Sequence, residues 1–271
     1  MQANNIFNFR RMQLYLQKHF ADQLRFYLMG AVATFGLVTL IGILLVLTHN
    51  HFDKISDIVP FYYVGLFAGG LLFTSRSFNE LAHKEKGVDF LLLPASQFEK
   101  FLTLFLISTI GFFLFYHISF YLSVNIVEKV QIAVNGLHVQ NDYKFLSDPD
   151  EKVYVYYVYF VLQAIFLFGA TCFHKYSFIK TVLCVLLFLF GLFLINSVIV
   201  TLLFGWKSEI WKSSIPFVMV HKMEVSGRLV HGGGSYLIPR WLLDAYAFIL
   251  RFIFAPVFWT LAYFRLKDQE I

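Results

Sequence analysis

The stretch TVLCVLLFLFGLFLINSVIVTLLF, residues 181–204, contains no charged side chain and is apolar at nearly every position. A helix needs about 20 such residues to cross the roughly 30 Å hydrocarbon core of a bilayer. The same character runs through the chain: of 271 residues, 58% are hydrophobic, 20% aromatic and only 14% charged, and the mean hydropathy is +0.66. Soluble domains carry about 25% charged residues. The composition therefore predicts a membrane protein and excludes a disordered chain or a disulfide-rich secreted domain.

Six segments are apolar enough and long enough to cross a membrane. Helices are expected for all of them, because unpaired backbone groups cost several kcal/mol each in lipid. The predicted spans are residues 27–48, 58–74, 101–126, 153–173, 181–204 and 241–264. The predicted fold class is an all-α membrane protein, with residues 1–271 forming a single transmembrane domain.

With six spans, both termini lie on the same side of the membrane. That side carries compact basic flanks, including Arg10, Arg11, Lys84, Lys100 and Arg265. Because cytoplasmic flanks are enriched in Lys and Arg, both termini are predicted to be cytoplasmic. The net charge of +5 is interpreted as attraction to anionic membrane lipid, and no nucleic-acid partner is expected.

Three segments outside the spans have patterns of their own. Residues 6–26 mix large apolar and basic side chains, which predicts an amphipathic helix in the membrane interface, with a solvated leader as the alternative. The outer loop 127–152 alternates apolar residues around Asn135-Gly136, which favours a β-hairpin over an irregular loop only slightly. The outer loop 205–240 is predicted to form a short interfacial helix or a re-entrant turn.

The loop 75–100 between the second and third spans ends in FLLLPASQFEK, residues 90–100. Pro94 disfavours helix in the residue before it, and Ser96 is placed to cap a new helix. Glu99, three residues later, completes the capping-box pattern. The loop is therefore predicted to contain a short helix, a break and a new helix that leads into the third span.

Several polar side chains fall inside the predicted spans. Arg251 lies near the middle of the sixth span, where a charge costs at least about 2.5–3.5 kcal/mol, and Asp244 is two turns earlier on the same face. Arg251 either faces an aqueous pathway, pairs with a carbonyl, Gln163 or Asn196, or snorkels to the interface. Interhelical hydrogen bonds are the expected role of Gln163, Asn196 and His117, with contact to a transported substrate as the alternative.

No catalytic motif is present in the sequence. Residues 232–234 are three glycines without the Gly-Lys-Ser/Thr that a phosphate loop needs. His49, His51 and Asp53 lie too close together to close a metal site alone. The chain is therefore not predicted to be an enzyme, and it is expected to hold no cofactor or metal of its own.

This layout, together with residues 90–100, resembles the membrane subunit of an ABC-2 type transporter. Bacterial permeases of this family often carry a similar Leu-Leu-Pro-x-Ser run ending in Lys just before the third span. The layout matches over nearly the whole chain, whereas the motif covers only those residues. The large outer loop after the third span departs from the family pattern and leaves any substrate analogy open.

The resemblance implies a permease subunit in a bacterial cytoplasmic membrane. Two copies, most simply identical, would form the translocation pathway, and separate ABC ATPase subunits would bind ATP and Mg²⁺. Residues 75–88 would include the coupling helix that contacts the ATPase, with the candidate residues Phe78, Glu80, Lys84 and Glu85. Charge reversal in this helix is expected to uncouple hydrolysis from transport without unfolding the protein. Gly69, with its neighbouring glycines, is expected to pack at the dimer seam.

Two other classes of function compete with this interpretation. A secondary transporter would use Arg251 and Asp244 for ion coupling, but such folds usually contain internal repeats, and residues 1–135 do not resemble residues 136–271. The second competing class is a non-transport assembly subunit of a larger membrane complex. Co-purification of a nucleotide-binding chain would separate the permease from both.

Overall fold

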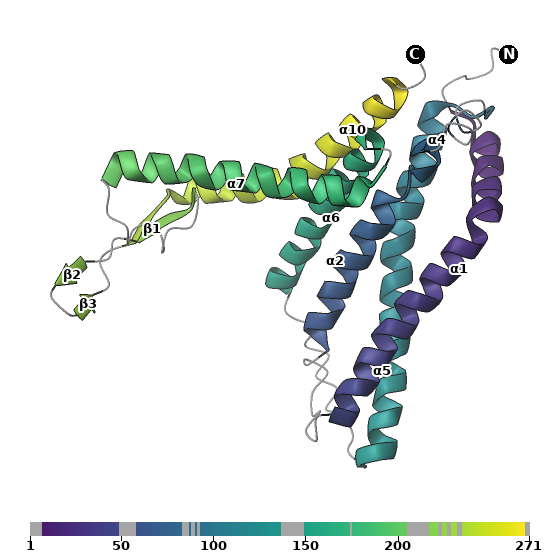
Figure 1. Cartoon of the computed structure of the whole chain (residues 1–271), viewed down its shortest axis with the longest axis horizontal. Coiled ribbons are helices and arrows are strands. Elements are labelled where there is room, and N and C mark those ends of the chain that lie inside the picture. The colour runs from purple at the N-terminus through teal and green to yellow at the C-terminus, as the bar shows by residue number, and fades with distance from the viewer. Residues whose placement is uncertain are drawn as a thin grey trace. The chain divides into compact units, whose positions relative to one another are not determined.

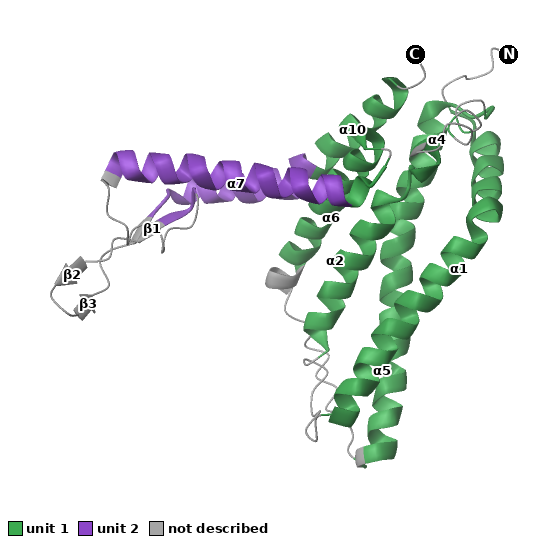
Figure 2. Cartoon of the chain, viewed as in Figure 1, with its two compact units in different colours: residues 1–178, 255–271 green, residues 179–254 purple. Residues whose placement is uncertain are grey.

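The computed structural model (Figure 1) describes residues 7–48, 58–82, 87, 90, 93–136, 149–173, 175–204, 217–221, 224–226, 229–231 and 235–268. Five helices are long and apolar enough to cross a membrane: Phe9–Thr48, Gln97–Val134, Val153–Cys172, Ser177–Leu203 and Arg240–Lys267. The protein is thus a predominantly helical membrane protein, as predicted. By contact density it divides into two compact units, residues 1–178 with 255–271 and residues 179–254 (Figure 2).

In unit 1, helix α1 (Phe9–Thr48) runs parallel to the helix formed by α4 (Gln97–Phe105), the π-helical segment η3 (Leu106–Gly111) and α5 (Phe112–Asn135). Arg11 pairs with Glu99 at one end of these helices. Farther along, the hydroxyls of Thr39 and Ser123 are 2.8 Å apart. We call the end that holds Arg11 and Glu99 the near end, and the opposite end, where Val46 and Val127 are buried, the far end.

Because these two helices run in the same direction, the chain must return between them, and α2 (Val59–Ser75) makes this return (Figure 1). Ile58 joins the buried cluster of the far end, and Phe78, just past α2, joins that of the near end. At 17 residues, α2 is about 26 Å long and falls short of the usual span length. Five helices are thus long enough to cross the membrane. The sixth predicted span, α2, is supported by its path from the far end to the near end.

The glycines of α2 pack against rings of the same chain. A Cβ on Gly65 would overlap the Tyr116 hydroxyl, and one on Gly69 would lie 3.2 Å from the Phe112 ring. Gly70 faces Tyr159 in the same way. Gly69 and its neighbours thus pack closely against α5 and α6 (Pro149–Cys172) of the same chain, and their place at a dimer seam stays a prediction.

Helix α6 runs back toward the near end, and the C-terminal helix α10 (Phe254–Lys267) also ends there. The Phe98 ring makes edge contacts with Phe7, just before α1, and with Tyr263 in α10, at centroid distances of 6.1 and 6.0 Å. Both described ends of the chain therefore lie at the same end of unit 1. This is the arrangement that an even number of crossings requires.

Two sequence predictions for unit 1 need correction at helix boundaries. Residues 9–26 are helical, but no break separates them from the first span: α1 is one helix of 40 residues, about 60 Å long, that bends without interruption (Figure 1). Helix α5 continues to Asn135, so neither a hairpin nor an irregular loop forms over residues 127–135. Asn135-Gly136 instead ends the helix, with Gly136 at φ 65° in the left-handed C-cap conformation.

Unit 2 contains α7 (Ser177–Phe204) from Ile179 onward, two short β-ribbons, and α9 (Arg240–Phe248) with the π segment η5 (Ile249–Ile253). Strands β1 (Met219–His221) and β4 (Ser235–Leu237) pair antiparallel, as do β2 (Glu224–Ser226) and β3 (Leu229–His231). The predicted interfacial helix or re-entrant turn over residues 205–240 is therefore wrong for the described part of that segment. Helix α7 exposes apolar side chains on most of its surface, as a lipid-facing helix would.

Candidate functional site

The start of α4 has the local structure that its sequence predicts. The Ser96 side chain accepts a hydrogen bond from the Glu99 backbone N–H at 3.2 Å, and the Glu99 carboxylate accepts one from the Ser96 N–H at 2.8 Å. Both halves of the predicted capping box are present, so this prediction is confirmed. Glu99 is therefore held in a fixed position at the first turn of the helix.

The same carboxylate joins α4 to the first turn of α1. The Arg11 guanidinium donates to Glu99 Oε1 from Nη2 at 2.9 Å and from Nε at 3.3 Å, and the Asn8 backbone N–H donates to the same oxygen. Glu99 is fully buried, whereas the Arg11 side chain keeps 34% of its surface exposed. The sequence predicted the cap but missed this ion pair, because no local spacing relates residues 88 positions apart.

The connection between α2 and α4 is packed against the helices of the near end. Phe78 and Phe90 are each only 2% exposed. The Phe78 ring stacks on Phe101, with centroids 6.5 Å apart, and Phe90 makes an edge contact with Tyr15 of α1. The ammonium of Lys100, itself buried, lies 5.3 Å from the centre of the Phe90 ring. Residues from both halves of the connection thus belong to the hydrophobic core.

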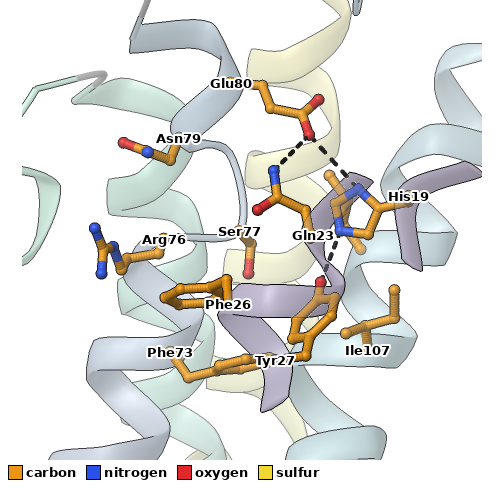
Figure 3. Close-up of a pocket in the computed structure, with 11 residues that line it drawn as sticks. His19, Gln23, Phe26, Tyr27, Phe73, Arg76, Ser77, Asn79, Glu80 and Ile107 are labelled. Atoms are coloured by element: carbon orange, nitrogen blue, oxygen red, sulfur yellow. Dashed lines mark hydrogen bonds and ion pairs between the residues drawn. The ribbon is translucent and has the colours of Figure 1, made fainter. Parts of the chain in front are cut away.

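A partly open cavity of about 160 Å³ lies beside this connection (Figure 3). Its walls come from α1, from the end of α2 with the turn and 3₁₀ helix η2 (Asn79–Ala82) that follow it, and from the junction of α4 and η3. The polar side chains in the wall are His19, Gln23, Tyr27, Arg76, Ser77, Asn79 and Glu80. It is the candidate functional site because it combines these groups with the segment expected to contact a partner.

Hydrogen bonds organise the wall of the cavity on the side of α1. The Tyr27 hydroxyl lies 2.7 Å from His19 Nε2, and the other ring nitrogen of His19 lies 3.7 Å from Glu80 Oε1. The Gln23 amide donates to the same Glu80 oxygen at 3.3 Å (Figure 3). Glu80 therefore connects the segment after α2 to two successive turns of α1.

The four coupling residues suggested by the family resemblance have different surroundings. Phe78 is buried in the core, so its packing fixes the connection rather than offering a free surface. Glu80 lies in the cavity wall and faces α1. Lys84 and Glu85 lie outside the described residues, as does the group His49, His51 and Asp53.

Gln163 joins three helices of unit 1. Its amide nitrogen donates to the Thr109 hydroxyl in η3 at 2.7 Å, and its carbonyl accepts from the Trp259 indole in α10 at 3.1 Å. The side chain is fully buried, and both ends of its amide are used. The expected interhelical hydrogen bonding is thus present, and it occurs where the main-chain ladder of η3 is widened to a π-helical turn.

A second polar group in the helices was only partly visible in the sequence. The Tyr62 hydroxyl of α2 lies 2.6 Å from His117 Nε2 and 3.0 Å from the Tyr156 hydroxyl of α6. The sequence singled out His117 but neither of the two tyrosines. The occurrence of a histidine and two tyrosines at similar depth in neighbouring spans could have indicated this group.

The remaining candidates lie in unit 2. Asn196 accepts a hydrogen bond from the Phe217 backbone N–H at 3.0 Å and so ties α7 to the residue pair that precedes β1. Arg251 lies half-buried in the π segment η5, and Asp244 is exposed on α9. The π segment ends three residues before Pro256, whose missing N–H and ring disturb a regular α-helical ladder in the preceding turn. Whether Arg251 faces an aqueous pathway, pairs with a polar group or snorkels stays a prediction.

Comparison with protein families, curated proteins and solved structures finds no match to this chain. The helices alone define its class as a membrane protein with several apolar spans.

Proposed function

We propose that this chain is the permease subunit of an ATP-driven ABC-2 type exporter in a bacterial cytoplasmic membrane. Two copies form the translocation pathway, and a separate ATPase binds the connection between α2 and α4. The proposal draws on the resemblance of residues 90–100 and of the predicted layout. It also draws on the structure of the near end.

The observation that carries the proposal is the attachment of this connection to the surrounding helices. Phe78 and Phe90 are packed in the core, and Glu99 binds both its own cap and Arg11. Because packed interiors transmit displacement rather than absorb it, a push on the connection moves α1 and α4 with it. A segment that couples a motor to a membrane pathway must have this property.

The path of the chain is compatible with the same function. Since α2 returns from the far end to the near end, the connection lies at the end where α1 begins and α10 finishes. Basic flanks favour the cytoplasm for this end. An ATPase bound to the connection would then have access to cellular ATP.

Affinity purification of the full chain from its native membranes tests the proposal. We expect an ATP-hydrolysing chain with a phosphate loop to co-purify, and the combined change Lys84→Glu and Glu85→Lys to reduce both its recovery and the hydrolysis rate. The control is Lys129→Glu, which alters an exposed charge near the far end of α5 and should change neither.

Absence of ATP hydrolysis and of any nucleotide-binding chain would contradict the proposal. Transport that follows an ion gradient in ATP-free vesicles would then indicate a secondary transporter. Stable recovery in a larger complex without transport would indicate an assembly subunit.

A further inference from the structure

The cavity at the near end lies where two predicted spans end. Its wall includes Tyr27, where the first predicted span begins, and Phe73, where the second ends. The rings of Phe26 and Phe73 stack at a centroid distance of 6.4 Å, and Tyr27 packs on Phe73 at 5.8 Å. Aromatic side chains gather at this level of membrane proteins, between hydrocarbon and water. We therefore expect the cavity to lie at the depth of lipid headgroups.

The cavity has groups of opposite charge in its wall. Arg76 places its guanidinium 5.1 Å from the centre of the Phe26 ring, and no described carboxylate forms an ion pair with it. Glu80 uses only Oε1 for its contacts with Gln23 and His19, so its second oxygen can accept further hydrogen bonds. Figure 3 shows Arg76 and Glu80 at separate positions around the cavity. A ligand that carries both a cation and an anion fits this arrangement.

The hydrogen-bonding groups distinguish between kinds of cation. Besides Glu80, the wall presents the Gln23 carbonyl, whose amide nitrogen is already used, and the Ser77 hydroxyl. A primary ammonium has three N–H donors and can satisfy three such acceptors. A quaternary ammonium has none. The wall is therefore better matched to ethanolamine than to choline.

We propose that this cavity binds a phosphorylated primary amine, the chemistry of the phosphatidylethanolamine headgroup. The ammonium is held by Glu80, Gln23 and Ser77, and the phosphate by Arg76. The volume of about 160 Å³ is enough for a group of several non-hydrogen atoms, since one water needs roughly 10–15 Å³ on the same measure. The site needs only a membrane-embedded chain and does not depend on the proposed export function.

Lipid binding to the purified full chain tests this site. Phosphatidylethanolamine and phosphatidylcholine with identical acyl chains are titrated into the protein in detergent, and bound lipid is counted by native mass spectrometry. We expect phosphatidylethanolamine to bind at least roughly tenfold more tightly, as the gain from charge-assisted hydrogen bonds implies. Soluble O-phosphoethanolamine, added as a competitor, distinguishes a free compound from a lipid as the source of the same chemistry.

Two variants test the contacts to the ammonium and to the phosphate of the ligand separately. Glu80→Gln should remove the preference for phosphatidylethanolamine over phosphatidylcholine, whereas Arg76→Gln should weaken both lipids about equally, by roughly tenfold, because both carry a phosphate. The controls Asp268→Asn and Arg25→Gln remove the same charges from exposed positions outside the cavity and should change binding less than twofold.

Equal binding of the two lipids, or a preference that survives Glu80→Gln, would overturn the proposal. If Glu80→Gln does not fold, as judged by size-exclusion chromatography, the proposal is tested by Arg76→Gln instead. The Arg76 side chain is exposed, so its replacement should leave the fold intact. Loss of binding in the controls as large as in Arg76→Gln would also overturn it.

Discussion

The ion pair between Arg11 and Glu99 is the polar contact of the near end whose energy can be dissected most directly. Arg11→Met removes the cation and leaves the carboxylate buried. Glu99→Gln removes the charge of the carboxylate but keeps one oxygen, which can still accept the capping-box hydrogen bond from the Ser96 N–H. The two changes break the same ion pair from opposite sides, so their costs should differ.

The exposure of each partner sets the expected magnitudes. Glu99 is 0% exposed, and breaking a buried pair so that a charge remains in the interior costs about 3–5 kcal/mol. Because Arg11 itself is 34% exposed and partly screened, we expect Arg11→Met to cost about 2–3 kcal/mol. Glu99→Gln leaves an arginine that can turn toward water, and it should cost about 1 kcal/mol. The double variant should cost less than the sum, with a coupling of about 1 kcal/mol.

The free energy of unfolding of all three variants is measured on the full chain in mixed micelles by denaturant titration, with helix content as the signal. Arg10→Met, an exposed neighbour of Arg11, is the matched control and should lie within about 0.5 kcal/mol of the unmodified chain. The reasoning is refuted if Glu99→Gln costs as much as Arg11→Met. It is equally refuted if the double variant equals the sum of the singles.

The same titration tests two features of the helix packing. Gly65→Val should lower the free energy of unfolding by about 1–3 kcal/mol, because its side chain would overlap a buried ring, whereas Gly30→Val enters open space and should change it by less than about 0.5 kcal/mol. Gln163→Leu should cost about 1 kcal/mol through loss of two interhelical hydrogen bonds, and Asn125→Leu, which loses a bond within one helix, should cost less. Equal costs within either pair would contradict the packing described above.

The spans were predictable because hydropathy over about 20 residues is a local property. The ends of the helices were harder to predict, as the end of α5 illustrates. Asn135-Gly136 is a hairpin signal in one context and a helix C-cap in another, since both need a residue with positive φ. What decided between them is the burial of Val127 and Gln131 against neighbouring helices, which no local pattern records.

Partners distant in the sequence could not be predicted at all. The capping box was readable because Ser96 and Glu99 are three residues apart, whereas the Arg11–Glu99 pair depends on α1 and α4 lying side by side. The rings that pack against Gly69 and its neighbours could not be predicted for the same reason. A small residue marks close packing, but its sequence does not say whether the neighbouring ring belongs to the same chain or to another.

Among the described residues, the charged contacts of α1 with the rest of unit 1 lie at the near end. Arg11 reaches Glu99, and His19 and Gln23 reach Glu80, so three side chains spread over four turns of α1 bind the two flanks of one connection. Toward the far end, α1 meets α5 through the hydroxyl pair Thr39 and Ser123 and through the apolar contact of Gly42 with Val127. A displacement of the connection is therefore transmitted first to the beginning of α1. The contacts of His19 and Gln23 with Glu80 form part of the cavity wall, so an occupant there would stiffen the part of α1 that receives the displacement.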